Sequence, residues 1–168
     1  MKLQLILFRH AQAEDVGPDG SDHGRRLTAH GTEQAAKTAK HLAKAHYHPD
    51  LVLVSDAART LGTWEHAEPW LGTMNDVKVK LRNLHQIYSD GVSELCTLIG
   101  KQDGREHPVI MLIGHNPSIS ELASVLTGRD LRFSKGQAVV MNLDSDSWAE
   151  AVYETGDWKV DAQFGGKH

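Results

Sequence analysis

The sequence has little of several features that mark whole classes of protein. It contains a single cysteine in 168 residues, Cys96, which excludes a disulfide scaffold and a cysteine-rich zinc module. Its 18 basic residues do not outnumber its 22 acidic ones, which argues against a nucleic-acid-binding surface. No apolar run approaches the ~20 residues of a membrane helix. We therefore expect one globular domain over residues 1–168, with no nucleic-acid or membrane partner.

The N-terminal segment superficially resembles an export signal. Lys2 precedes the apolar residues 3–8 (LQLILF), and residues 11–13 (AQA) imitate a cleavage site. The apolar run is shorter than the roughly 7–15 residues of a signal peptide, and Arg9 and His10 follow before the imitated site. We therefore predict a buried strand here and a cytoplasmic protein. A monomer is expected, because no segment has an unexplained apolar stripe.

Short apolar runs alternate with helical patterns along the chain. Residues 3–8, 51–54 (LVLV) and 109–113 (VIMLI) lack alternation, which is typical of strands buried on both faces of a parallel sheet. Residues 77–80 form a weaker candidate near an edge. The predicted helices span about 28–46, 55–68, 90–99 and 116–128. This order predicts a single-domain three-layer α/β/α sandwich around a mostly parallel sheet.

Two further segments have patterns of their own. Residues 138–143 (AVVMNL) and 149–153 (AEAVY) flank the turn-forming residues 144–147 (DSDS), which predicts a late antiparallel hairpin. Residues 14–27, with three glycines and one proline, are predicted to be a surface loop.

Charged side chains follow each buried strand. Arg9 and His10 follow the first, residues 55–60 (SDAART) follow the second, and residues 114–116 (GHN) follow the third. Because the carboxyl ends of parallel strands meet at one edge of a sheet, two arginines and two histidines converge there. Guanidinium groups match phosphate oxygens, and helix N-termini favour anions. The sequence predicts a phosphoryl-binding pocket with imidazole chemistry.

These motifs resemble those of the histidine phosphatase superfamily, the phosphoglycerate mutase-like enzymes. More narrowly, DHGRRLTAHG (residues 22–31) followed by VLVSDAART (residues 52–60) is similar to the short SixA-type phosphohistidine phosphatases. The resemblance covers nearly the whole chain and implies the phosphoglycerate mutase-like fold.

The resemblance also implies roles for individual residues. His10 would be the nucleophile, attacking phosphorus and becoming a phosphohistidine. Arg9, Arg59 and His115 would bind the phosphoryl oxygens and stabilise the charge that develops, with no metal or cofactor. His10 must be neutral to attack, and we expect the flanking arginines to lower its pKa.

Two further residues are candidates for substrate binding. Asn116 would help to place the phosphate through its backbone or its side chain. Arg25 would either reach into the mouth of the pocket or form a bridge to Asp22. Both alternatives remain open from the sequence. The histidines at positions 41, 46 and 48 straddle a helix end, so they do not have the fixed geometry that zinc requires.

The sequence departs from the larger superfamily members in its proton donor. Those enzymes supply an acidic residue from the segment that corresponds to residues 82–94, which reads RNLHQIYSDGVSE here. His85, Asp90 and the acidic residues of the 14–27 loop (Glu14, Asp15 and Asp22) are the remaining candidates. A phosphoester releases an alkoxide that needs a proton, whereas a phosphoramidate can release an imidazole that is already protonated.

We therefore expect a metal-independent phosphatase that acts on phosphohistidine, with a phosphorylated protein as its partner. Only 56 residues separate Arg59 from His115, which leaves little chain for a lid over the pocket. The alternatives are a small-molecule phosphomonoesterase or mutase of the same fold, and a non-catalytic phosphate-binding module.

Overall fold

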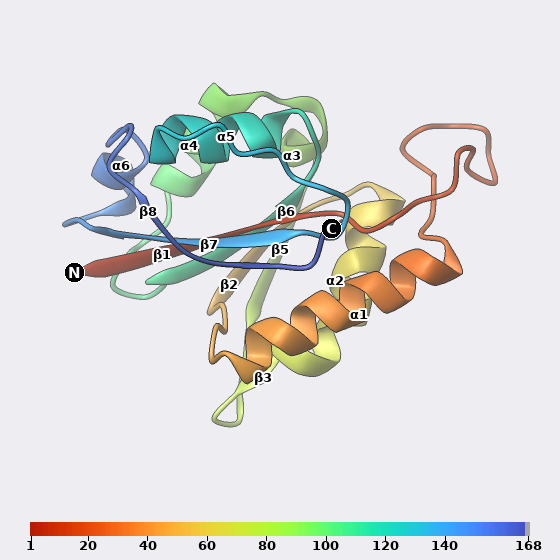
Figure 1. Ribbon diagram of the computed structural model, residues 1–168, viewed down its shortest axis with the longest axis horizontal. Coiled ribbons are helices and arrows are strands. Elements are labelled where there is room, and N and C mark those ends of the chain that lie inside the picture. Colours follow the sequence, from red (N-terminus) through yellow and green to blue (C-terminus); the bar gives the residue numbers. More distant parts are fainter. Residues whose placement is uncertain (167–168) are drawn as a thin grey trace.

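A computed structural model describes residues 1–166 and contains a six-stranded sheet between two layers of helices (Figure 1). The strand order is β5-β2-β6-β1-β7-β8. The first four strands in this order run parallel, and β7 is antiparallel to both of its neighbours. The strands are β1 (Lys2–Arg9), β2 (Leu51–Ser55), β5 (Lys80–Leu84), β6 (Val109–Gly114), β7 (Ala138–Asp144) and β8 (Lys159–Phe164).

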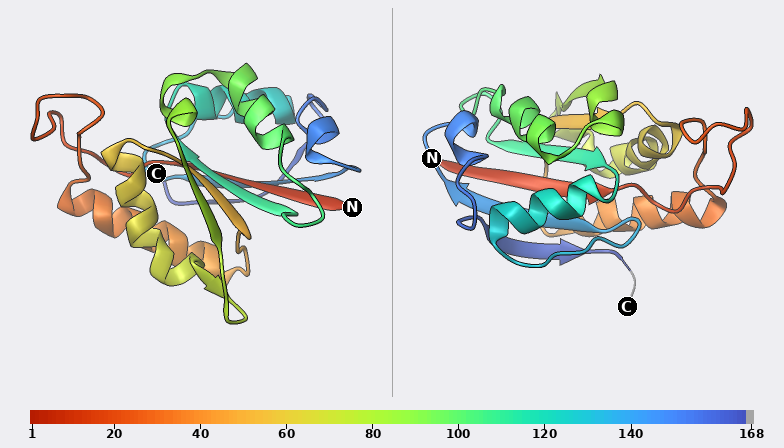
Figure 2. Two further views of the ribbon diagram at one scale, coloured as in Figure 1. Left: turned by 180° about the vertical axis from the view of Figure 1, so that it is seen from behind. Right: turned by 90° about the horizontal axis from the view of Figure 1, so that it is seen from above.

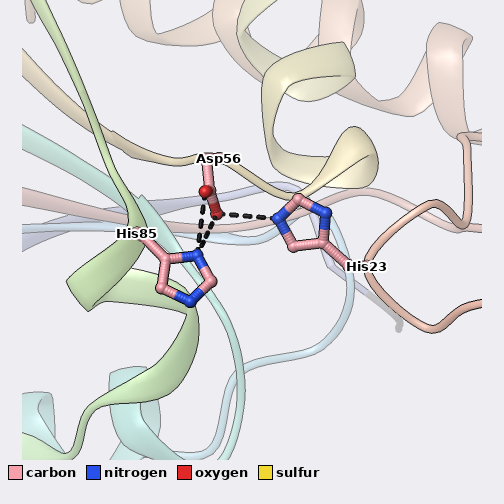
Figure 3. Close-up of side chains that lie close together, drawn as sticks. All are labelled: His23, Asp56 and His85. Atoms are coloured by element: carbon pink, nitrogen blue, oxygen red, sulfur yellow. Dashed lines mark hydrogen bonds and ion pairs between the residues drawn. The ribbon is translucent and has the colours of Figure 1, made fainter.

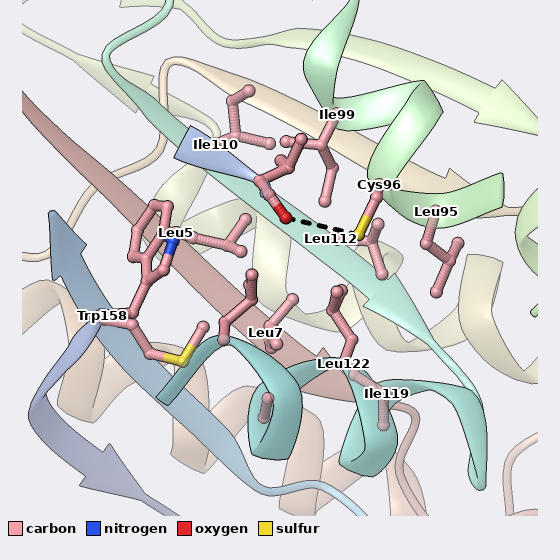
Figure 4. Packing of buried hydrophobic residues seen from close by; sticks show 14 of the residues in the cluster. Leu5, Leu7, Leu95, Cys96, Ile99, Ile110, Leu112, Ile119, Leu122 and Trp158 are labelled. Carbon is pink, nitrogen blue, oxygen red and sulfur yellow. Dashed lines mark hydrogen bonds between the residues drawn. The ribbon is translucent and has the colours of Figure 1, made fainter. Parts of the chain in front are cut away.

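Helices cover both faces of this sheet, which explains the apolar runs of its central strands. On β1, Leu5 and Leu7 pack into one hydrophobic cluster, whereas Ile6 and Phe8 pack into the other. Figures 1 and 2 show α1 and α2 on one face and the remaining helices on the other. Figure 4 shows the packing of the cluster that contains Leu5 and Leu7. The helices are α1 (Ala29–Lys44), α2 (Ala58–Leu71), α3 (His85–Ser89), α4 (Val92–Gly100), α5 (Ser118–Thr127) and α6 (Trp148–Ala151). The predicted three-layer fold is confirmed.

The predicted hairpin partner of β7 is wrong. Residues 149–153 belong mostly to α6, and β7 pairs instead with β8. Ser147 begins α6 by accepting a hydrogen bond from the backbone of Glu150 (3.2 Å), as a helix N-cap does. Trp148 is fully buried and stacks on Trp158 with ring centroids 5.9 Å apart. The burial of this tryptophan pair fixes a helical turn where the local pattern suggested a strand.

Most of the strand predicted at residues 77–80 does not belong to the main sheet. Val77–Lys78 (β4) pairs only with Thr73–Met74 (β3) in a small separate hairpin, and the edge strand of the main sheet is β5. Most of β5 is exposed, so no apolar run marks it in the sequence. The short helix α3 directly after β5 was likewise not predicted.

The segment between β1 and α1 forms an exposed loop, as the sequence predicted, and its two ends are held together. Ala13 and Leu27 form an isolated β-bridge. Thr28 is the N-cap of α1, accepting from the backbone of Gly31 (3.0 Å) and donating to Gln12 Oε1 (2.7 Å). A Cβ at Gly31 would lie 2.0 Å from the carbonyl oxygen of Gln12, so only glycine allows this close approach. Among residues 1–166, no helix is long and apolar enough to cross a membrane.

Candidate active site

The carboxyl ends of β1, β6 and β2 form the floor of the candidate site. Arg9 ends β1 opposite Gly114 of β6, and the backbone N–H of His10 donates to the Gly114 carbonyl (3.1 Å). This register places the next residues, His10 and His115, side by side, with ring centroids 5.4 Å apart. Parallel pairing therefore brings together two histidines that are more than 100 residues apart in sequence.

His10 is oriented by its own backbone neighbour. Its side chain is buried, with 5% relative exposure, and Nδ1 lies 2.7 Å from the carbonyl oxygen of Ala11. A carbonyl can only accept a hydrogen bond, so the hydrogen of the neutral ring is on Nδ1. The lone pair of the ring is consequently on Nε2, the nitrogen that can attack an electrophile.

The pKa of His10 is lowered to about 3, first because burial disfavours the charged ring and then because of the nearby His115, Arg59 and Arg9. The hydrogen bond to Ala11 acts in the opposite direction but is outweighed. This is the direction expected from the sequence, although burial contributes more than the arginines do.

We expect the His10 ring to remain neutral from pH 8 down to pH 5. A histidine with an ordinary pKa near 6.5 takes up its proton across this range. In an NMR titration, the ring C–H signals of His10 should instead stay constant across this range. A His10 signal that titrates near pH 6.5 would contradict both the lowered pKa and a ready nucleophile.

His115 is held by the end of β2. Its Nε2 lies 2.8 Å from Ser55 Oγ, and Ser55 Oγ in turn accepts from the backbone N–H of Ala57 (3.3 Å). A hydroxyl has one hydrogen and two lone pairs, so Ser55 Oγ can either donate to Nε2 or accept from it. Burial, followed by the charge of Arg59, lowers the pKa of His115 to about 4, so the ring is neutral. Its Nδ1 is buried and without a partner.

The two arginines present further donors beside His10. Arg9 Nη1 donates to the carbonyl of Phe133 (2.8 Å), and Arg59 donates to the carbonyl and carboxylate of Asp22 (2.8 and 3.1 Å). The Nε atoms of both arginines are buried and have no partner. Buried donors are nearly always satisfied in folded proteins. Within residues 1–166, two unpartnered guanidinium donors and an unpartnered imidazole nitrogen close to His10 therefore indicate a binding site for an anion.

Two threonines fix the position of Arg59 at the start of α2. Thr60 Oγ1 donates to the carbonyl of Ser55 (2.9 Å). Thr63 Oγ1 accepts from the backbone of Ala11 (3.0 Å) and donates to the carbonyl of Arg59 (2.8 Å). The spacing of Arg59, Thr60 and Thr63 thus joins the first turn of α2 to the ends of both β1 and β2.

Asn116 directly follows His115, but its side chain already has hydrogen-bond partners. Its amide donates to the same Phe133 carbonyl that binds Arg9 (3.0 Å), and its Oδ1 accepts from Ser120 (2.6 Å). These bonds brace the segment that positions Arg9. Of the two alternatives for Asn116, the structure leaves its backbone rather than its side chain available to a phosphate.

The sequence left two positions open for the Arg25 side chain, and the structure shows the one in which it bridges to Asp22. Its Nη1 lies 2.9 Å from Asp22 Oδ1, and its Nε donates to the carbonyl of Glu14 (2.7 Å). Asp22 also accepts from the hydroxyl of Tyr88 (2.8 Å), which with Arg59 lowers the pKa of Asp22 to about 2. The loop therefore places a fixed carboxylate against Arg59.

Three of the candidate proton donors have partners other than the two central histidines. Glu14 pairs with Arg26 (3.3 Å), His85 bonds to Asp56 (2.8 Å), and Asp90 accepts from Ser89 (2.9 Å). Within residues 1–166, no hydrogen bond or ion pair joins these three candidates to His10 or His115.

Tyr88 lies beside His115 and was not predicted from the sequence. Its ring stands edge-on to His115 with centroids 5.5 Å apart, and Arg59 lies 5.8 Å from its centre. In the sequence, Tyr88 was marked only by its position in residues 82–94, the segment expected to supply the proton donor. Its hydroxyl holds Asp22, so Tyr88 connects α3 to the loop at the mouth of the pocket.

A model of the histidine phosphatase superfamily (branch 1) matches residues 5–88, half of the chain. The chain belongs to the histidine phosphatase superfamily. An uncharacterised chloroplastic protein of Arabidopsis thaliana is 31% identical over 166 residues, which cover 94% of this chain and 75% of that protein. The superfamily assignment suggested by the sequence motifs is thereby confirmed.

Solved structures agree with this fold. One from Agrobacterium tumefaciens, provisionally described as the phosphohistidine phosphatase SixA, superposes with a TM-score of 0.78 at 23% identity and covers 97% of both chains. A mycobacterial glucosyl-3-phosphoglycerate phosphatase gives 0.65 at 13% identity, covering 98% of this chain and all of that one. This histidine phosphatase therefore shares its backbone fold more fully with the SixA structure.

Proposed function

We propose that this histidine phosphatase removes the phosphoryl group from phosphohistidine on a protein, through a covalent intermediate on His10. The observation that best supports the proposal is the neutral His10 ring with its lone pair on Nε2, close to two buried guanidinium donors that lack partners within residues 1–166. Such donors, fixed before the reaction begins, stabilise the negative charge of a transferring phosphoryl group without a metal ion.

The proposed reaction has two steps. Nε2 of His10 attacks phosphorus while the bond to the substrate imidazole breaks, and the leaving ring departs neutral because its other nitrogen is already protonated. Arg9, Arg59 and His115 donate to the phosphoryl oxygens throughout. Water then attacks the phosphorus of phospho-His10, the P–Nε2 bond breaks, and inorganic phosphate leaves the regenerated neutral histidine. The covalent intermediate divides one difficult displacement into two.

The contacts of Asp22 favour a substrate with a nitrogen–phosphorus bond. Asp22 is ionised at neutral pH and bound to two arginines, so it is a poor proton donor for an alkoxide. A leaving imidazole that is already protonated needs no proton donor.

A groove of about 640 Å³ also opens beside Arg9, lined by polar side chains that include Gln12, His30 and Lys135. This groove could accommodate residues that flank a phosphohistidine on another protein.

A small phosphomonoester is the second candidate substrate, and the mycobacterial structure is described as a phosphatase of this kind. A mutase is a weaker alternative, because no acidic residue is buried within residues 1–166. A non-catalytic phosphate-binding module is also weaker, because it would not need a neutral histidine with a free Nε2. A monomeric state and a cytoplasmic location remain predictions from the sequence.

The substrate preference can be measured as phosphate release in the presence of EDTA. We expect kcat/KM for a phosphohistidine peptide to exceed that for 3-phosphoglycerate by at least 100-fold. Activity on p-nitrophenyl phosphate should be intermediate, because p-nitrophenolate leaves without a proton. Equal or higher efficiency on the alkyl phosphate would favour the phosphomonoesterase, and loss of all activity in EDTA would contradict the metal-independent mechanism.

A further inference from the structure

Three metal-ligating side chains from separate segments meet beside the proposed active site. His23 comes from the loop between β1 and α1, Asp56 follows β2, and His85 is the first residue of α3 after β5. Figure 3 shows both imidazole rings directed at the carboxylate of Asp56. Within residues 1–166, this is the one group of three histidine, cysteine or acidic residues whose ligand atoms all lie within 4.8 Å of one another.

The distances are close to those of a coordination sphere. His23 Nε2 lies 2.8 Å from Asp56 Oδ1, and His85 Nδ1 lies 2.8 Å from Oδ2. Two ligands bound tetrahedrally to one ion at 2.0–2.2 Å are separated by about 3.4 Å. Since no pair is further apart than 4.8 Å, the largest closing motion required is about 1.4 Å. The side chains of His23 and His85 are 41% and 62% exposed, so both can make this adjustment.

The donor set indicates which ion would bind. Two neutral imidazoles with one carboxylate suit Zn²⁺ and related transition metals, whereas Mg²⁺ and Ca²⁺ prefer oxygen ligands throughout. Three protein ligands leave further positions for water. The other clustered histidines of the sequence, His41, His46 and His48, do not form such a group in the described part of the chain.

We propose that His23, Asp56 and His85 form a binding site for a divalent transition-metal ion, with Zn²⁺ as the best fit. This site is separate from the phosphoryl-transfer residues and does not depend on the proposed function. The ion would join the 14–27 loop to the ends of β2 and β5 by replacing the two histidine–aspartate hydrogen bonds.

The proposed metal site lies beside the residues that hold the 14–27 loop against Arg59. His23 directly follows Asp22, which binds Arg59, and its ring packs edge-on against Tyr88 with centroids 4.8 Å apart. The carbonyl of His23 also accepts from the backbone of Ala58 at the start of α2 (3.0 Å). An ion bound to His23 would therefore hold Asp22 in its place against Arg59.

The test is titration of the metal-free protein with ZnCl₂ by calorimetry, alongside thermal unfolding. We expect one zinc ion per chain at pH 7.5. At a free zinc concentration about 100-fold above Kd, the Tm should rise by about 5–10 °C.

Variants distinguish this site from scattered surface histidines. His85→Ala and His23→Ala should each weaken zinc binding at least tenfold and abolish most of the rise in Tm. His41→Ala, which removes an exposed histidine on α1, should bind zinc as the unmodified protein does. The proposal is overturned if the unmodified protein binds no zinc, or if both cluster variants bind it as tightly as the His41→Ala control. These zinc-binding results are independent of phosphatase activity, which is measured in EDTA.

Discussion

The His10→Ala variant is expected to lose phosphatase activity by about four orders of magnitude, the scale seen when a covalent nucleophile is removed. Alanine deletes the Nε2 lone pair that would attack phosphorus, and the remaining donors would only bind the substrate. The measurement is phosphate release from a phosphohistidine peptide and from p-nitrophenyl phosphate. A second readout is an acid-labile phosphoenzyme, trapped by quenching the unmodified protein during turnover, which should be absent from the variant.

Two controls separate lost chemistry from a damaged pocket. His10→Gln keeps a polar side chain of similar size and should be as inactive as His10→Ala, whereas His41→Ala should keep full activity. Thermal unfolding should show that the His10 variants remain folded. If His10→Ala turns over substrate at the unmodified rate, His10 is not the nucleophile, and the proposed mechanism fails whatever the substrate.

Arg59→Ala is expected to lower kcat/KM by about 10³-fold, the effect of losing an oriented donor to a developing oxyanion. The guanidinium has two functions that alanine cannot provide. Its Nε is a buried donor without a partner in residues 1–166, and its terminal nitrogens bind Asp22 of the loop. We therefore expect weaker substrate binding, seen as a raised KM, and a slower chemical step, seen as a lowered kcat.

Arg59→Lys tests whether charge alone is sufficient. A lysine ammonium cannot reproduce the planar arrangement of donors, so we expect it to recover less than a tenth of the lost activity. The matched control is Arg132→Ala, because the Arg132 side chain is 85% exposed and pairs only with its neighbour Asp130. Near-normal kinetics for Arg59→Ala would show that the phosphoryl group is bound elsewhere.

The sequence was most informative about the centre of the sheet. The uninterrupted apolar runs of β1, β2 and β6 are required by burial on both faces, so both their strand character and their parallel arrangement could be predicted. The residues directly after these strands could then be assigned to one edge. His10, Arg59 and His115 were identified in this way before their contacts were known.

The sequence failed where local pattern and tertiary packing disagree. Residues 149–153 have strand-like composition, but the buried stacking of Trp148 on Trp158 holds their first part in a helical turn. The edge strand β5 lacks an apolar run because it is largely exposed, and its position is set by pairing with β2. Both errors arise because long-range contacts outweigh local preference.

By itself the sequence predicted the layered fold, placed Arg9, His10, Arg59 and His115 at one edge of the sheet and showed that no acidic residue directly follows β5. Only the tertiary structure decided which way each ring is oriented, which donors lack partners and which carboxylates are engaged. It also decided that His23, Asp56 and His85 meet. These properties depend on distances between atoms from separate segments, and such distances are fixed by packing and strand register rather than by the order of residues.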